Sequence, residues 1–296
     1  MSGTPRMSVV TPTWNRRGAL PGAIESVRAQ SVQDYEHLIV DDGSSDGTAG
    51  MLAERYGDDP RIRLIRQPHA GVSAARNRAV AQARAPWVGL LDSDDRWEPH
   101  CIESHLRNAT RHPDADVLVA DCRYVGEHGH GWKTAMTRSE WRPPDSLESV
   151  CHGGWVVPSA LAIRTSALRS EPFDESVRLA EDLDLLIRFL VAGRKVRVSR
   201  EVVARYHAGE APGDETRLTA DARGMLIAMQ EIRQRHAHHC DACRQDPLGL
   251  ARRRAKWRME QGRWREARQD LVFWWLRRPG STTALRGLLR SLLARR

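Results

Sequence analysis

Residues 87–95 read Trp87-Val88-Gly89-Leu90-Leu91-Asp92-Ser93-Asp94-Asp95, an apolar run that passes directly into four polar residues, three of them acidic. A short apolar run that stops at turn-forming residues is typical of a strand buried within a sheet. The polar residues then leave the carboxyl end of this strand as a loop. The sequence therefore predicts a buried strand whose end presents a group of carboxylates.

The same strand-then-loop pattern occurs twice nearer the N-terminus. Residues 7–11 form a β-branched run that meets a loop at Pro12, and residues 37–40 form a second run that meets the polar loop 41–48. Residues 61–66 alternate like a further strand, and helical patterns cover 20–29, 48–56 and 73–83. Alternating strands and helices build a mostly parallel sheet whose ligands bind at the carboxyl ends of the strands. The loops that start at Pro12, Asp41 and Asp92 are therefore expected to converge on one crevice.

The rest of the chain divides into two parts. Strand-like runs occur at 115–120, 159–164 and 195–198, and an amphipathic helix is predicted over 182–192. Four helical stretches follow, over 222–236, 250–261, 263–277 and 283–295. We therefore predict an α/β domain over residues 1–215 and a helical extension over residues 216–296. Within the extension, residues 271–276 are expected to pack on the main domain or on a partner.

The basic charge of the chain lies in that extension. The whole chain carries +8, whereas residues 251–296 hold fourteen Lys and Arg against three acids, a net +11. Residues 1–250 therefore carry −3. A basic tail indicates an acidic partner such as an anionic membrane surface, nucleic acid or a phosphorylated acceptor, although a solvated helical surface has the same composition.

Other features of the sequence indicate a cytoplasmic protein. No apolar stretch reaches the roughly 18 residues that a spanning helix needs, and residues 1–6 lack the layout of a signal peptide. The five cysteines are scattered and odd in number, which argues against a disulfide framework. The tail is basic and residues 285–296 are amphipathic, so the sequence is also compatible with peripheral binding at the inner face of the membrane.

The pair Asp92 and Asp94 suits a hard cation. Two carboxylates so close together are difficult to hold without one, and Mg²⁺ or Mn²⁺ binds through one or two carboxylates plus substrate phosphates. Such an ion would neutralise a diphosphate leaving group. Taken alone, an Asp-x-Asp pair is also common in solvated turns.

Further motifs place this pair in a known context. They are Ser8–Asn15, Val40–Thr48, Gly71–Asn77, Leu91–Asp95, Phe173–Glu175 and Glu181–Arg188. In order and spacing they resemble the family 2 glycosyltransferases of the GT-A fold, over about residues 7–210. The resemblance implies a metal-dependent, inverting transfer of a sugar from a nucleotide sugar, with UDP favoured over dTDP and GDP. The acceptor stays open among a glycan, a lipid-linked sugar, a natural product and a peptide.

The resemblance also implies roles for individual residues. Donor-binding positions are Pro12, Thr13 and Asp42 at the base, Arg76 near the base and phosphates, Asp92 at the ribose or sugar, and Ser93 beside it. Asp94 corresponds to the ligand of Mg²⁺ or Mn²⁺, and His207 to a histidine near the metal or diphosphate, though its spacing departs from the commoner one. Asp182 corresponds to the catalytic base. Asp41 and Asp46 are interpreted as turn and helix-cap residues.

Three alternatives remain at this point. A nucleotidyltransferase can share this sheet, but its Gly-rich, basic loop after the first strand is not matched by residues 12–17. A non-enzymatic module could bind membrane or RNA through the basic tail, with nucleic acid the less favoured of the two. Finally, a zinc site is considered at a cluster of residues of the types that bind zinc: His236, His238, His239, Cys240 and Cys243. The cluster has one spaced cysteine pair, whereas a strong zinc signal has two.

Overall fold

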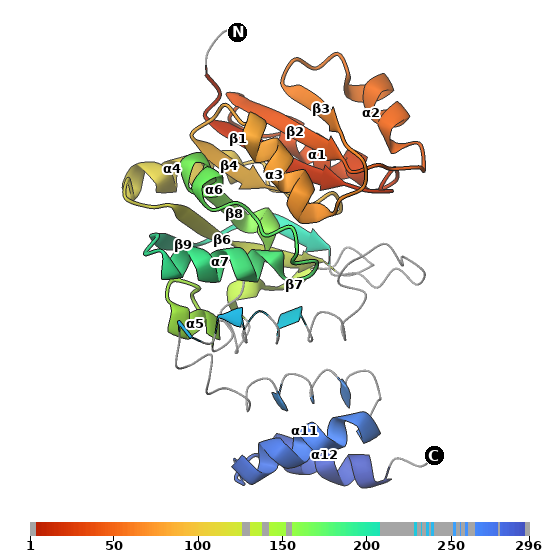
Figure 1. The fold of residues 1–296 in the computed structure, drawn as a ribbon, viewed down its shortest axis with the longest axis vertical. Helices are drawn as coiled ribbons and strands as arrows, with labels where there is room; N and C mark the ends of the chain where they lie inside the picture. Colours follow the sequence, from red (N-terminus) through yellow and green to blue (C-terminus); the bar gives the residue numbers. More distant parts are fainter. Residues whose placement is uncertain are drawn as a thin grey trace.

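The computed structural model (Figure 1) describes residues 4–125, 131–137, 142–151, 156–207, 228–229, 232, 235–236, 238–239, 251–252, 255, 258–259, 264–277 and 279–293. The strands are β1 (Met7–Thr13), β2 (Tyr35–Asp41), β3 (Ile62–Arg66), β4 (Trp87–Leu90), β5 (Arg96–Trp97), β6 (Val117–Val125), β7 (Gly131–Thr134), β8 (Leu161–Arg164) and β9 (Val196–His207). The helices are α1 (Leu20–Arg28), α2 (Thr48–Tyr56), α3 (Val72–Gln82), α4 (Cys101–Arg111), α5 (Leu147–Cys151), α6 (Thr165–Ser170), α7 (Glu181–Val191), α11 (Trp264–Arg277) and α12 (Thr282–Leu293).

All the strands of the described ranges belong to one sheet, in the order β3-β2-β1-β4-β8-β6-β9-β5, with β7 paired to β6. The first four are mutually parallel, as the alternation of strands and helices predicted. Beyond β4 the sheet is mixed, because β8 runs antiparallel to both of its neighbours while β6 and β9 are parallel to each other. The carboxyl ends of β1, β2 and β4 therefore lie along one edge.

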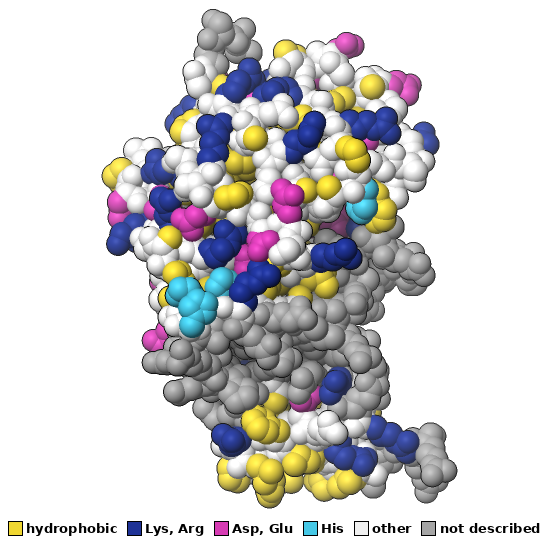
Figure 2. All heavy atoms as spheres, viewed as in Figure 1, with side chains coloured by type: hydrophobic (Ala, Val, Ile, Leu, Met, Phe, Trp, Pro, Cys, Tyr) yellow, Lys and Arg dark blue, Asp and Glu magenta, His cyan; other side chains and the backbone are white. Residues whose placement is uncertain are grey.

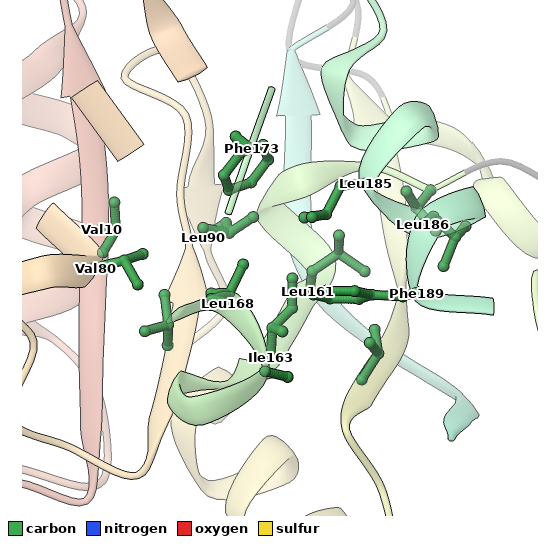
Figure 3. Packing of buried hydrophobic residues seen from close by; sticks show 14 of the residues in the cluster. Val10, Val80, Leu90, Leu161, Ile163, Leu168, Phe173, Leu185, Leu186 and Phe189 are labelled. Carbon is green, nitrogen blue, oxygen red and sulfur yellow. The ribbon is translucent and has the colours of Figure 1, made fainter. Parts of the chain in front are cut away.

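Helices cover both faces of this sheet because side chains of a strand alternate between faces. On β1, Val10 packs with residues of α3, α6 and α7, whereas Val9 packs with residues of α1 and α4. Figure 3 shows the first of these clusters, in which Leu168 and Phe189 approach the strand residues Leu90 and Leu161. The sheet is thus held between two apolar layers, and its loops are left at the edge.

The structure extends several predicted strands, including β2, which spans Tyr35–Asp41, and β6, which runs to Val125. β1 continues through Pro12 to Thr13; Pro12 lies beyond the last β1–β4 pair and is paired with β2 alone, so its missing N–H is tolerated there. β9 continues to His207, although residues 199–201 break its apolar pattern. α4 was not predicted; its buried face has few apolar side chains, since it includes Ser104 and His105.

The predicted extension contributes two well-defined helices. α11 and α12 occupy the last two predicted helical stretches, whereas 222–236 and 250–261 lie largely outside the described residues. Leu271 and Trp274 pack in a cluster formed by the extension itself and not in the core of the main domain, which was one of the two expectations for residues 271–276; packing on a partner stays a prediction. Ile232, in contrast, is 3% exposed and belongs to the same cluster as α7.

We expect Phe189→Ala to lower the free energy of unfolding by about 3–5 kcal/mol, because this side chain is 1% exposed between α7 and the sheet. Urea denaturation measures the change. Val191→Ala on the same helix is the control, since Val191 is 38% exposed and should change stability by no more than about 0.5 kcal/mol. Equal effects of the two variants would contradict this assignment of the core.

Candidate active site

The loops that follow β1, β2 and β4 meet at one edge of the sheet. The backbone N–H of Asn15 donates to Ser44 Oγ at 2.9 Å, and Asn15 Oδ1 accepts from the N–H of Ser45 at 2.8 Å. On the other side, Arg16 Nη2 lies 4.0 Å from Asp94 Oδ2. The loop after β1 therefore bridges the two acidic loops, and the convergence predicted from the strand pattern is confirmed.

Asp42 is buried at the end of β2 and its carboxylate accepts from several donors. Oδ1 accepts from Gln67 Nε2 at 2.7 Å and from the N–H of Ala70 at 2.9 Å, and Oδ2 accepts from the N–H of Gly71 at 2.8 Å. His69 Nδ1 lies 2.9 Å from Oδ2. Since a carboxylate offers about four acceptor positions, Asp42 can accept from a ligand only if one of these donors withdraws.

Two rings stand beside Asp42 at the surface. Trp14 and His69 stack with their centroids 4.4 Å apart and an angle of 24° between their planes. Trp14 is 38% exposed, and the side chain of His69 is 53% exposed, so His69 is the most accessible donor to Asp42. Below them, Thr13 Oγ1 is buried and has no hydrogen-bond partner in the part of the chain that the structure describes. Thr13 and Asp42 are joined by a hydrogen bond from the N–H of Asp42 to Thr13 O at 2.9 Å, and with Pro12 they lie at the carboxyl ends of β1 and β2.

The loop after β4 is fixed by Asp95, which sequence reasoning had not singled out. Ser159 Oγ accepts from the N–H of Asp92 at 3.1 Å and donates to Asp95 Oδ2 at 2.6 Å. The N–H of His207 donates to Asp95 Oδ1 at 3.0 Å. Burial, with the charges of Asp94 and Asp92 added, raises the pKa of Asp95 well above its usual range. Asp95 therefore ties this loop to β8 and β9.

Arg76 joins the loop after β4 to α7. It is 1% exposed; Nη2 donates to Asp92 Oδ1 at 2.7 Å and Nη1 to Glu181 Oε1 at 2.6 Å, while the guanidinium lies 5.3 Å from the ring centroid of Phe173. Burial raises the pKa of Asp92, although the charge of Arg76 opposes that rise. Because both Nη groups of Arg76 are occupied by carboxylates, its role at the donor stays a prediction.

Asp182 stands in the first turn of α7 and is not part of that bridge. As expected for adjacent helical residues, the two acids separate, since Glu181 turns to Arg76 while Asp182 Oδ1 accepts from the N–H of Leu183 at 2.8 Å. Burial, together with the charge of Glu181, raises the pKa of Asp182 to about 7. A carboxyl group with that pKa can exchange a proton near neutral pH, which suits a general base.

Asp92 and Asp94 are both partly exposed carboxylates of this loop. The side chain of Asp92 is 28% exposed and is bound to Arg76, whereas that of Asp94 is 23% exposed and lies 4.0 Å from Arg16. The described ranges contain no ready cluster of three or more metal-ligating side chains. One or two carboxylates nevertheless suffice for Mg²⁺ or Mn²⁺ when substrate phosphates complete the shell, so the donor set fits.

His207 lies next to the same loop but already has a partner. Its Nε2 is 3.1 Å from Arg96 Nη1, and since a guanidinium has no acceptor, His207 Nε2 accepts this hydrogen bond. Metal ligation through that nitrogen therefore needs Arg96 to move. The role of His207 remains a prediction.

Other sequence-based interpretations can be placed on the structure. Asp41 Oδ1 accepts from the N–H of Ser44, and Asp46 Oδ1 accepts from the N–H of Thr48, the first residue of α2, so both make local turn contacts. The N-cap position of α2 itself is Gly47. In the zinc candidate cluster, Cys240 and Cys243 lie outside the described residues. No sequence signal pointed to Ser159, His69 or Trp14.

We expect Asp182→Asn to stabilise the metal-free protein at pH 8 but not at pH 4. Below about pH 4 the carboxyl group is protonated in both states; above its folded-state pKa of about 7, the folded protein holds a charge that burial disfavours. The gain therefore grows between these limits, to no more than about 4 kcal/mol. Thermal melts in EDTA measure it, with the exposed Asp145→Asn as control. An equal effect at both pH values would contradict the raised pKa.

Comparison with known proteins identifies the family. Residues 8–161 match the family model described as Glycosyl transferase family 2. Chondroitin synthase of Pasteurella multocida (strain Pm70) is 36% identical over 240 residues, which are 79% of this chain and 24% of that protein. Chondroitin synthase of Escherichia coli is 39% identical over 212 residues, which are 70% of this chain and 29% of that protein. The chain thus spans about a quarter of the length of these relatives.

Solved structures share the fold. The mannosyltransferase PcManGT from Pyrobaculum calidifontis, in complex with GDP-Man and Mn²⁺, aligns with a TM-score of 0.66 at 15% identity, covering 99% of this chain and 81% of its own. S. aureus TarS 1-349 in complex with UDP-GlcNAc aligns with a TM-score of 0.62 at 21% identity, covering 83% and 71%. The family match, the site's motifs and this sheet agree: the chain belongs to the family 2 glycosyltransferases and has their GT-A fold.

Proposed function

We propose that this protein is a metal-dependent, inverting glycosyltransferase that moves a sugar from a nucleotide sugar to an acceptor nucleophile. The observation that carries the proposal is the bridge of Arg76 between Asp92 and Glu181. It pairs two acids of the site with one guanidinium. Two neighbouring acids carry the proposed chemistry: Asp182, with a pKa of about 7, and Asp94, whose side chain is 23% exposed and lies 4.0 Å from Arg16.

The donor is a nucleoside diphosphate sugar in this proposal, with UDP as the nucleotide. Pro12, Thr13 and Asp42 form the wall for the base, and the unpartnered Thr13 Oγ1 offers a hydrogen bond there. The imide N–H of uracil suits Asp42 once His69 withdraws. TarS and PcManGT, whose structures hold UDP-GlcNAc and GDP-Man, support the donor class. The chondroitin synthases among the relatives support a glycan as acceptor.

The metal site in this proposal comprises Asp94, with His207 as a second candidate. Mg²⁺ or Mn²⁺ there supplies positive charge that stabilises the departing diphosphate. The chain's own contribution is to hold Asp94 in place, through the contacts of Asp95 with Ser159 and His207. The Mn²⁺ in the PcManGT structure supports the choice of ion.

Asp182 is the base of the reaction. Above about pH 7 it is a carboxylate and can accept the proton of the acceptor hydroxyl as that oxygen attacks the anomeric carbon. Attack opposite the leaving diphosphate in a single displacement inverts the anomeric configuration. Arg76 keeps Glu181 turned away from the acceptor, because that carboxylate is bound to its guanidinium at 2.6 Å.

The expected outcome of Asp182→Asn is a loss of turnover of about 100-fold or more with nucleotide binding retained, since the amide cannot accept the proton. The assay is Mn²⁺-dependent hydrolysis of UDP-GlcNAc, UDP-glucose, dTDP-glucose and GDP-mannose, with calorimetric titration of the matching nucleoside diphosphate. Asp145→Asn is the matched control on the surface. Near-normal turnover of Asp182→Asn would contradict the assignment of Asp182 as the base. Turnover that EDTA does not reduce would contradict the proposed requirement for a metal ion.

We also propose that the protein works in the cytoplasm and contacts the inner face of the membrane through its C-terminal helices. No helix in the part of the chain that can be described is long and apolar enough to cross a bilayer. The hairpin of α11 and α12 nevertheless exposes five large hydrophobic side chains: Val272 and Leu276 on α11 and Leu285, Leu289 and Leu292 on α12.

The composition of this hairpin surface favours an anionic bilayer. Leu285, Leu289 and Leu292 are spaced four and three residues apart, which places them on one side of α12, and Arg286 and Arg290 are exposed beside them. Figure 2 shows hydrophobic side chains gathered at the end of the molecule formed by α11 and α12, with basic side chains next to them. Two copies packed face to face would oppose their arginines, whereas anionic lipid would pair with them.

In a flotation assay the protein is expected to bind vesicles that contain phosphatidylglycerol and to bind pure phosphatidylcholine vesicles far less. Leu289→Ser with Leu292→Ser should reduce binding several-fold, because both the apolar contact and the charge attraction are needed. Leu64→Ser, at a comparably exposed position on β3, is the control. Equal binding to both vesicle types, or concentration-dependent self-association that the double variant abolishes, would contradict membrane contact.

A further inference from the structure

Asp184 is a buried acid on the catalytic helix that the proposed reaction does not use. It lies two residues after Asp182 on α7 and is 0% exposed. Its Oδ2 accepts from Arg188 Nε at 2.8 Å, and its Oδ1 lies 2.9 Å from His236 Nε2. Burial acts to raise the pKa of Asp184, but the hydrogen bonds from His236 and Arg188 outweigh it and the pKa is lowered. Asp184 is therefore a buried carboxylate whose charge is stabilised by the hydrogen bonds that it accepts.

One of these donors comes from a distant part of the sequence. His236 is 52 residues beyond Asp184, in the predicted C-terminal extension, and its side chain is 8% exposed. Ile232, one helical turn earlier, is buried in the cluster that contains residues of α7, and Met229 packs against that cluster. This short part of the extension is thus anchored on the catalytic domain, beside α7.

The residue before His236 reaches the segment on the other side of the active-site turn. Arg235 Nη1 donates to Asp174 Oδ2 at 2.6 Å. Asp174 follows Phe173, which lies against Arg76, and the same segment runs to Ala180. Ala180 has a φ of 56°, a left-handed conformation that is strained for a residue with a Cβ and that persists only when its surroundings hold it. Glu181 and Asp182 follow directly.

We infer that Arg235 and His236 form a two-point clamp that positions Asp182. Arg235 holds the segment before the Ala180 turn, and its Nη1 also lies 3.7 Å from Asp184 Oδ1. His236 holds the helix after the turn through the shorter contact with Asp184, so the turn that aims Asp182 is fixed on both sides. The inference rests on the proposed role of Asp182 as base. His236 is a positioning residue, because it acts through Asp184. Misplacement of a reacting group by about 1 Å costs about 100-fold in rate, which sets the scale of the expected effect.

The test compares His236→Ala with His236→Gln and with the exposed His239→Ala. Turnover is measured as Mn²⁺-dependent hydrolysis of the nucleotide sugar that the wild-type chain hydrolyses fastest, and affinity as calorimetric binding of its nucleoside diphosphate. We expect kcat of His236→Ala to fall about 10- to 100-fold while KM and the nucleotide Kd change less than about two-fold. The amide of His236→Gln can donate to Asp184 and should restore most of kcat, and His239→Ala should match the wild type.

A second measurement tests the clamp independently of catalytic activity. Amide hydrogen exchange over residues 180–184 is expected to accelerate in His236→Ala, to return towards wild type in His236→Gln and to stay unchanged in His239→Ala. Unchanged exchange in His236→Ala, or exchange in His236→Gln as fast as in His236→Ala, overturns the clamp. A kcat equal to wild type, or a parallel loss of kcat and nucleotide binding, overturns it as well. Full activity of Asp182→Asn would instead identify the proposed base as the error, and the exchange result would still decide the clamp.

Discussion

The buried guanidinium of Arg76 is the interaction on which the rest of the site depends. Taking a cation and two carboxylates out of water costs several kcal/mol per ion, and this is repaid only where the geometry is close and the donors are satisfied. Here both Nη groups meet carboxylate oxygens within 2.7 Å, one from the loop after β4 and one from α7. The buried Nε has no hydrogen-bond partner among the described residues, so the two Nη contacts carry the pairing. A single side chain of α3 thereby fixes the separation between the side of the site proposed for the metal and the side proposed for the base.

This arrangement also explains why neighbouring acids differ in character. Glu181 is hydrogen-bonded to Arg76, whereas Asp182, one residue later, has a pKa of about 7 because burial and the charge of Glu181 both raise it. Asp95 accepts hydrogen bonds from Ser159 and from the backbone of His207, whereas Asp94 is 23% exposed and lies 4.0 Å from Arg16. Environment, and not residue type, gives these nearby carboxylates different partners, exposures and pKa values.

Much of this could be anticipated from the sequence. The parallel arrangement of β1 to β4 and the meeting of their loops follow from strand and helix periodicity, and the turn contacts of Asp41 and Asp46 follow from local side-chain chemistry. The full length of β9 could not be anticipated, because residues 199–201 interrupt its pattern although pairing with β6 and β5 maintains the strand. The contacts of Ser159 and His69 could not be anticipated either, because no pattern of neighbouring residues indicates which groups they bind.

By itself the sequence determined the fold class, the family and which loops meet at the candidate site, because these depend on periodicity and on motifs of neighbouring residues. Only the tertiary structure decided which partners each acid has and which distant residues hold it. Arg76 meets Glu181 across 105 residues, and His236 meets Asp184 across 52. Burial and charge pairing act through space, so the pKa of Asp182 depends on contacts that no run of neighbouring residues specifies.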